Sequence, residues 1–180
     1  MQCTKLLEND HKIILRALNV LQEMAAKIET GEFVDSGDVE TLLRFLQLFE
    51  DEYHQTKEES ALFPELRRSG NTEQKELKHM LFEHEQERSL VTGLEEALKT
   101  KKGPDFVFYS KRLIALLRNH IYKEDHILFE IVEKSLTDKQ DLNVVEEFSK
   151  FQRHFESGPG NALLRELHRL EWEYMKRRSA

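Results

Sequence analysis

Two stretches of the chain follow one pattern: HQTKEESALF at residues 54–63 and HIYKEDHILF at residues 120–129. Both read H-x-x-K-E-[ED]-x-x-L-F, with a histidine four residues before a glutamate. In an α-helix, residues four apart lie on the same face. His54 and Glu58 therefore point the same way, and so do His120 and Glu124. The repeat predicts two helices that present the same pair of polar side chains.

The sequence around the repeats predicts an all-α fold. Glycine and proline divide the chain into segments of about 30 residues, and these segments carry apolar residues at helical spacing. Four such helices with short connections predict an antiparallel up-down four-helix bundle. The helices are expected at about residues 4–29, after Asp38, from about Thr72, and after Asp105.

The bundle is expected to carry a C-terminal helical extension. Asp38 is the expected N-cap of the second helix, and Pro64 is expected to end or kink that helix. Thr137 and Gln140 form a capping-box pattern that predicts a fifth helix, and a last helix is expected over about residues 162–177. We assign residues 1–136 to the bundle. Residues 137–180 are the extension, which packs on the bundle or forms a partner surface.

Two further histidines lie on the apolar faces of the other two helices. His11 lies one turn from Leu7, and His84 lies on the apolar side of the third helix. Counted from the connecting turns, the histidines of each antiparallel pair lie at the same depth to within about one helical turn. We therefore expect four imidazoles and two carboxylates in one buried layer. The predicted metal site comprises His11, His54, Glu58, His84, His120 and Glu124.

Two carboxylates among buried imidazoles need a compensating charge. An ionised carboxylate alone in a protein core is costly, and two together repel each other. A cation removes both costs. Either one divalent ion takes all six donors, or two ions take two histidines each and share Glu58 and Glu124. Imidazole and carboxylate donors suit iron and also manganese, whereas tetrahedral zinc fits this set poorly.

The composition excludes several other classes of function. The formal net charge is −7, and the basic run KRR at residues 176–178 is short, so we expect no nucleic-acid partner. No apolar run approaches the ~20 residues of a membrane span, and the N-terminus has no secretory apolar region. Cys3 is the single cysteine, which excludes a thiolate metal cluster. We expect a cytoplasmic protein without a membrane partner and leave a homodimer open.

Four motifs, one in each expected helix, resemble those of the hemerythrin-like (HHE cation-binding) family: DHKIIL, HQTKEESALFP, EHEQER and HIYKEDHILF. The resemblance covers about residues 5–135, which is the whole expected bundle. It implies a four-helix bundle with two non-haem iron ions in an Fe–O–Fe centre. It also implies that the centre binds dioxygen or related small molecules.

The resemblance assigns roles to particular residues. On the fourth helix, oxygen-carrying hemerythrins use an aspartate five residues after the histidine, which here is Asp125. Di-iron proteins that repair iron–sulfur clusters use a glutamate four residues after it, which here is Glu124. We prefer Glu124, because the internal repeat pairs it with the bridging carboxylate Glu58. The family's histidine ligands correspond to His11, His54, His84 and His120.

The third helix departs from the oxygen carriers. These proteins have two histidines there, four residues apart, but the earlier position is Met80 in this chain. The pair Glu83-His84 instead resembles the repair proteins and the eukaryotic iron-sensing hemerythrin domain. The departure favours a centre that reacts with or senses oxygen, nitric oxide or peroxide over plain oxygen carriage. A cysteine-rich N-terminal region like that of the repair proteins is not seen.

The function we predict is binding or sensing of a small oxidant, namely dioxygen, nitric oxide or peroxide, at a di-iron centre. One alternative is an enzyme that turns over peroxide or nitric oxide, and another is iron–sulfur-cluster repair or iron handling. A ferritin-like oxidase would use E-x-x-H pairs instead, such as Glu8–His11 and Glu76–His79. A helical interaction module without metal is the last alternative.

The remaining polar residues near the motifs are not counted in the predicted ligand set. Glu83 and Asp125 are either reserve oxygen ligands or carboxylates that are solvated or that support a metal ligand. Lys57 and Lys123 are expected on the helix surface. The other four histidines are expected away from the ligand face: His79, His126, His154 and His168.

Overall fold

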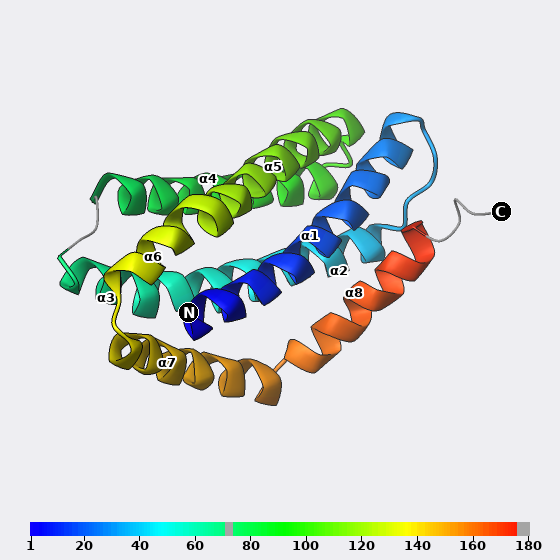
Figure 1. Cartoon of the computed structure of the whole chain (residues 1–180). Helices are drawn as coiled ribbons and strands as arrows, with labels where there is room; N and C mark the ends of the chain where they lie inside the picture. The colour runs from blue at the N-terminus through cyan, green and yellow to red at the C-terminus, as the bar shows by residue number, and fades with distance from the viewer. Residues whose placement is uncertain (71–73, 176–180) are drawn as a thin grey trace.

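The computed structural model describes residues 1–70 and 74–175, and all regular secondary structure in these ranges is helical. The predicted all-α class is confirmed. Within the same ranges, every helix is too short or too polar to cross a lipid bilayer. Figure 1 shows long helical stretches side by side, with α7 (Asp138–Ser157) and α8 (Gly160–Met175) along one side of them.

The N-terminal part of the chain forms four long helical stretches, in which η denotes a π-helical segment. The first stretch is α1 (Gln2–Glu29), and the third is α4 (Gln74–Lys99). The second runs through α2 (Ser36–Phe45), η1 (Leu46–Gln55), η2 (Glu58–Leu62) and α3 (Phe63–Arg68). The fourth runs through α5 (Gly103–Lys123), η3 (Glu124–Leu128) and α6 (Phe129–Ser135).

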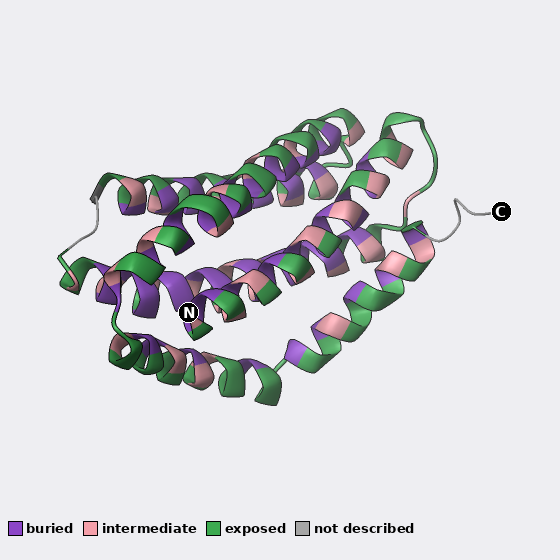
Figure 2. Cartoon of the chain, viewed as in Figure 1, coloured by how far each residue is buried: buried purple, intermediate pink, exposed green. Residues whose placement is uncertain are grey.

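The four stretches pack through two apolar clusters. α5 contacts both α4 and α1, and η1 also contacts α1 and α4. The larger cluster includes Leu18, Phe49 and Leu117, and the smaller one includes Leu7 and Leu62. Buried residues follow the inward faces of the stretches (Figure 2). Along the first three stretches the predicted site residues lie between the parts that enter the two clusters. On the fourth stretch His120 and Glu124 lie on either side of Ile121, the last residue of the larger cluster, so a polar layer separates the two clusters.

The helix α7 begins as the sequence predicts. The Thr137 hydroxyl accepts a hydrogen bond from the Gln140 backbone N–H, and the Gln140 side chain accepts one from the Thr137 N–H. This reciprocal pair satisfies backbone donors that a helix N-terminus leaves unpaired. The predicted capping box is confirmed.

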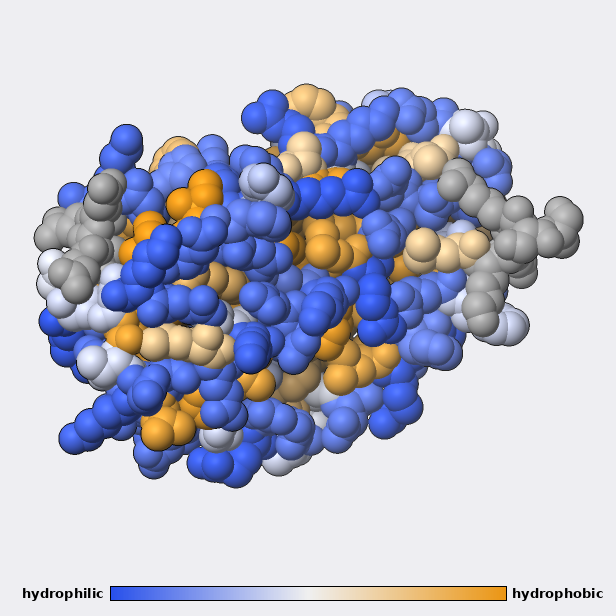
Figure 3. Space-filling model, viewed as in Figure 1, coloured by the Kyte–Doolittle hydropathy of each residue, from blue (hydrophilic) through white to orange (hydrophobic). Residues whose placement is uncertain are grey.

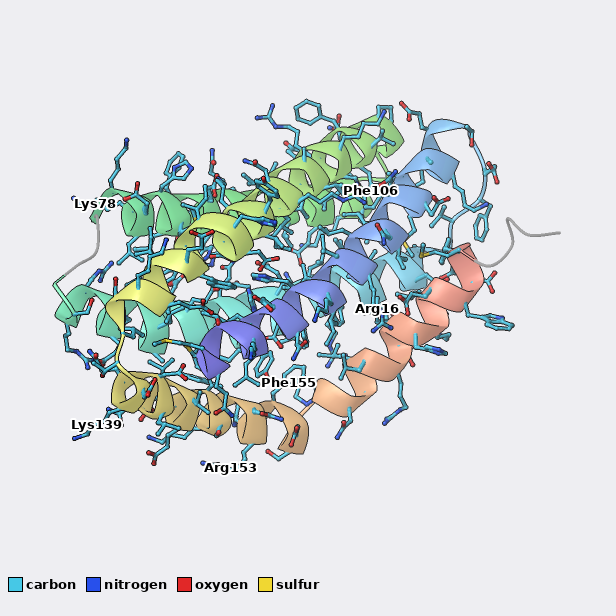
Figure 4. All side chains as sticks on the ribbon, viewed as in Figure 1. Arg16, Lys78, Phe106, Lys139, Arg153 and Phe155 are labelled. Carbon is cyan, nitrogen blue, oxygen red and sulfur yellow. The ribbon has the colours of Figure 1, made fainter. Side chains whose placement is uncertain are left out.

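The last two helices contact the first two stretches. α7 lies against α1, η1 and η2, and α8 lies against α1 and α2. Figure 4 shows Phe155 of α7 pointing toward the stretches and Arg16 of α1 near α8. The Phe155 ring stacks on Tyr53 with 4.4 Å between centroids, and Arg16 pairs with Glu171 of α8 at 2.6 Å. The two helices therefore cover one side of α1 and η1.

The prediction that Asp38 caps the second helix is wrong. The Asp35 side chain accepts hydrogen bonds from the backbone N–H groups of Gly37 and Asp38, which makes Asp35 the N-cap of α2. Asp38 instead accepts hydrogen bonds from Arg169 and Tyr174 of α8, at 2.7 and 2.8 Å. Both aspartates suit a cap, and the contact with α8 occupies one of them.

Two other helix boundaries differ from the prediction. The second stretch does not end at Pro64 but continues to Arg68, with this proline in the first turn of α3 directly after the π-helical segment η2. The kink that was expected there as the alternative stays a prediction. α5 begins at Gly103 and so includes Asp105 in its first turn. The predicted start at Thr72, the predicted end at Arg177 and the run at 176–178 lie outside the described residues.

The surface of the molecule is largely hydrophilic. Figure 3 shows blue residues over most of one face, with orange apolar patches between them. Some large apolar side chains are exposed, including Phe82 and Ile127. Both line a surface pocket that also includes Lys123 of the second repeat.

Candidate metal centre

The two sequence repeats share a π-helical segment at equivalent positions. The π-helical segments η2 and η3 begin at Glu58 and Glu124 and end at Leu62 and Leu128, which are equivalent positions of the repeat. A π-helical turn changes the direction in which side chains leave a helix, and such turns are frequent at functional sites. The repeat is therefore present in the structure as well as in the sequence.

The structure brings all six predicted site residues into one buried layer. None of the six side chains is exposed. They form two groups of four, and within each group the ligand atoms all lie within 4.8 Å of one another. The members are His11 and His54 in one group, His84 and His120 in the other, and Glu58 and Glu124 in both.

Each shared glutamate faces both groups. The two carboxylate oxygens of Glu124 lie 3.1 Å from His11 Nε2 and 3.3 Å from His120 Nε2, respectively. The two oxygens of Glu58 lie 3.8 and 3.5 Å from the Nε2 atoms of the other two histidines. Each carboxylate thus offers one oxygen to each histidine pair, which is the arrangement of a carboxylate that bridges two ions.

Two of the histidines contact a carboxylate through Nδ1, on the side of the ring away from the shared glutamates, and this carboxylate comes from the acid at the sixth position of a repeat. His11 Nδ1 lies 2.7 Å from Asp125, and His84 Nδ1 lies 2.7 Å from Glu59. Each of these acids directly follows a shared glutamate. A carboxylate at Nδ1 fixes the proton on that nitrogen, so the lone pair of Nε2 points into the layer.

The other two histidines, His54 and His120, are held by acids that directly precede His11 and His84 in the sequence. His54 Nδ1 lies 3.3 Å from Asp10, which also accepts a hydrogen bond from the repeat's lysine, Lys57. The second repeat has the same chain of contacts, with 2.9 Å between Nδ1 and the carboxylate. Its members are His120, Glu83 and Lys123.

These contacts decide between the roles expected for two acids and correct one other expectation. Glu83 and Asp125 belong to neither group of ligands and support histidines through Nδ1, which is one of the two roles that the sequence suggested for them. The expectation that both lysines lie on the surface is wrong for Lys57, whose side chain is 2% exposed, whereas that of Lys123 is 17% exposed. Lys57 is buried because α7 lies over it.

The last two letters of the repeat lie against the layer or beside it. The Phe129 ring lies parallel to His11 at 5.7 Å between centroids, and the Phe63 ring stacks on His84 at 6.1 Å. The leucine before each phenylalanine is buried. The fixed phenylalanines thus contact the layer, and the fixed leucines belong to the smaller apolar cluster beside it. A pseudo-two-fold relation exchanges α1 with α4 and η2 with η3, and it relates the half of the layer around His11 and His54 to the half around His84 and His120.

The donors in the layer fit a pair of cations. Among the described residues, both oxygens of Glu58 and of Glu124 and the Nε2 atom of His11 are buried without a hydrogen-bond partner. Burial and the charge of Glu124 raise the pKa of Glu58 well above the usual range. Burial lowers the pKa of His54 to about 4 and keeps this ring neutral. Cations between the groups would satisfy the oxygens and neutralise both carboxylates, and these donors suit iron or manganese.

A family model of the hemerythrin HHE cation binding domain matches residues 4–132. The chain belongs to this family. The match includes all six residues of the two groups and ends before α7. Neither the curated proteins nor the solved structures contain a significant match to the chain.

This hemerythrin HHE domain also has buried acids that the sequence reasoning missed. Glu50 and Glu87 are buried, and the Gln55 amide donates hydrogen bonds to both. Glu87 lies 3.9 Å from His120 Nδ1, so the cluster of Glu50, Gln55 and Glu87 adjoins the polar layer. Burial and then the charge of Glu87 raise the pKa of Glu50. Each acid lies about one helical turn from a site histidine, which is the signal that could have revealed it.

The remaining histidines lie outside the layer. The His79 side chain is 52% exposed and contacts Glu83 and Lys123. The ferritin-like alternative requires Glu76 and His79 as ligands, and neither belongs to a ligand group within the described residues. The other three are His126 of η3, which faces the Tyr122 carbonyl, His154 of α7 and His168 of α8.

Proposed function

We propose that this hemerythrin HHE domain binds two iron ions and uses them to bind or sense a small oxidant, namely dioxygen, nitric oxide or peroxide. One observation carries the proposal: each of two buried carboxylates offers one oxygen to each of two histidine pairs. Manganese is the alternative metal, since it accepts the same donors. The proposed ligands are His11, His54, Glu58, His84, His120 and Glu124.

The number of donors supports binding of a further small molecule. Each position has two imidazoles and two carboxylate oxygens, fewer than the about six ligands of an octahedral ion. Bound iron supplies redox chemistry and coordination positions for the oxidant. The chain itself orients the imidazoles through carboxylates at Nδ1, which increases their basicity. Phe63 and Phe129 line the layer with apolar surface that excludes water.

We further propose the division of the chain. Residues 1–136 act as an antiparallel four-helix bundle that holds the metal, and residues 137–180 act as an extension. The contacts of α7 and α8 with α1, α2 and η1 support packing of this extension on the bundle. A cytoplasmic location and a homodimer stay predictions.

Elemental analysis of protein purified without chelator tests the proposal. We expect about two iron ions per chain, with the near-ultraviolet bands of a bridged ferric pair in the oxidised protein. The His126→Gln variant is the control, because His126 lies outside both groups and its loss leaves the metal content unchanged. Absence of bound metal after anaerobic reconstitution with ferrous iron would overturn the proposal.

Stopped-flow mixing separates binding from turnover at the same centre. The reduced protein is mixed with dioxygen, nitric oxide or peroxide, and the products are counted per iron pair. We expect one stable adduct per pair, as binding or sensing requires. Many equivalents of peroxide or nitric oxide consumed per pair would identify the enzyme alternative instead.

A further inference from the structure

The pseudo-two-fold relation is broken outside the metal layer. α7 packs into the groove between α1 and η2. The equivalent groove, between α4 and η3, has no covering helix among the described residues and forms a surface pocket of about 540 Å³. The buried side chains of Met80 and Leu128 line it, together with the exposed Phe82 and Ile127. One groove is therefore filled and the other is open.

The support of His54 is sealed by α7. Lys57 Nζ lies 4.0 Å from the centre of the Tyr53 ring and 5.5 Å from that of Phe148, a residue of α7. Asp10, which links Lys57 to His54, is also buried. Separating this ion pair leaves two charges without water, which is expensive. The His54 ring is therefore firmly held.

The equivalent support of His120 reaches the surface. Lys123 forms part of the pocket wall, and its Nζ lies 3.1 Å from Nε2 of the exposed His79. His79 also lies 3.2 Å from Glu83, the acid that holds His120. Glu83 is as buried as Asp10, but the side chains of Lys123 and His79 are 17% and 52% exposed. Water can therefore reach Lys123 and His79 when they move away from Glu83, so their separation costs less than that of Lys57 and Asp10.

We infer that the ion at His84 and His120 exchanges with solution through the α4/η3 pocket, while the ion at His11 and His54 is retained behind α7. The inference rests on the two-ion site proposed above. Release of an ion requires local opening of a ligand and access for water. The open groove permits both beside the second histidine pair, and α7 blocks both beside the first pair.

Chelation of the fully loaded ferrous protein tests this inference. Excess of a coloured ferrous chelator is added anaerobically, and iron release is followed by absorbance. We expect two phases of equal amplitude whose rates differ by about tenfold or more, since supporting acids of metal ligands typically change metal affinity about 10–100-fold. A single phase that releases both ions would overturn the inference but leave the two-ion site intact. Protein that binds no iron would overturn the proposed function instead.

Matched variants assign the phases. Lys57→Met and Lys123→Met make the same change at pseudo-equivalent positions. We expect Lys57→Met to accelerate only the slow phase and Lys123→Met to alter only the fast phase. Phe148→Ala is an independent test, because it exposes Lys57 without removing its charge, and we expect it to accelerate the slow phase. Acceleration of the fast phase by Lys57→Met or Phe148→Ala would overturn the inference.

Discussion

The half of the layer around His11 and His54 and the half around His84 and His120 contain equivalent ligands, acids, lysines and rings. They differ outside the layer, where α7 covers the half around His11 and His54 and a pocket opens beside the half around His84 and His120. The sequence repeat therefore gives both halves the same donors, and the packing of the extension makes their surroundings different. In the proposed two-ion site, two ions with the same donors need not behave alike.

The largest effect is expected from the shared carboxylates. Glu58→Gln and Glu124→Gln each remove a charged donor from both groups, and a neutral amide is a weak iron ligand. Iron should fall from about two ions per chain to below about one in each variant. His54→Gln and His120→Gln each affect one group, so about one ion should stay bound. A glutamate variant that still holds two ions would contradict the shared role.

The supporting acids should distinguish the two halves by stability. Asp10→Asn leaves Lys57 buried without a counter-charge and should lower the free energy of unfolding by about 3 kcal/mol. Glu83→Gln leaves the more exposed Lys123 able to reach water and should cost under about 1 kcal/mol. Urea unfolding in the presence of chelator measures both. Equal losses would show that α7 does not seal the first half.

The two phenylalanine rings stacked on site histidines should contribute equally to stability in the two halves. Phe129→Leu removes the stacking partner of His11, and Phe63→Leu removes that of His84. Each should lower the free energy of unfolding by roughly 1 kcal/mol, since both are stacked rings of the same kind. The same urea titration gives both values. A difference larger than the loss itself would break the pseudo-two-fold relation inside the layer.

The smallest effect concerns the link between α7 and α1. Asp141 of α7 accepts hydrogen bonds from the backbone N–H groups of Gln2 and Cys3 and so caps α1. Burial opposes ionisation of Asp141, but its hydrogen bonds with Cys3 and Gln2 outweigh burial and lower the pKa of the carboxyl group. Asp141→Asn should lower the free energy of unfolding by about 1 kcal/mol at neutral pH.

The pH dependence of this link has a definite sign. A carboxyl group whose pKa is lower in the folded state adds stability above its unfolded pKa of about 3.9, and this stability is lost as the pH falls through the folded pKa. The difference in unfolding free energy between wild type and Asp141→Asn should therefore shrink below about pH 4. A difference that grows in acid would contradict the cap.

The repeat and the apolar faces of the other two helices together were enough to predict which residues meet in the layer. Helical spacing places His54 with Glu58 and His120 with Glu124, and the apolar faces place His11 in the same layer. The acids behind the histidines were partly visible, since Asp10 directly precedes His11 in the sequence. A supporting role was expected as one alternative for Glu83 and Asp125 but not for Asp10 or Glu59, because it depends on which side chains other helices bring to Nδ1.

Burial of Lys57 could not be predicted from its own surroundings. The identical position of the second repeat, Lys123, is partly exposed, so local sequence does not separate them. The difference comes from Phe148, far along the chain in α7. The error at Asp38 has a local origin, because the cap of α2 is made by Asp35 three residues earlier. Contacts between distant segments thus account for the error at Lys57 only.

Anomalous diffraction at the iron absorption edge, from a crystal of the reconstituted protein, tests the central claim most directly. The account predicts two anomalous peaks per chain, one between His11 and His54 and one between His84 and His120, with carboxylate oxygens of Glu58 and Glu124 at both. A single peak, or peaks away from these six residues, would contradict it.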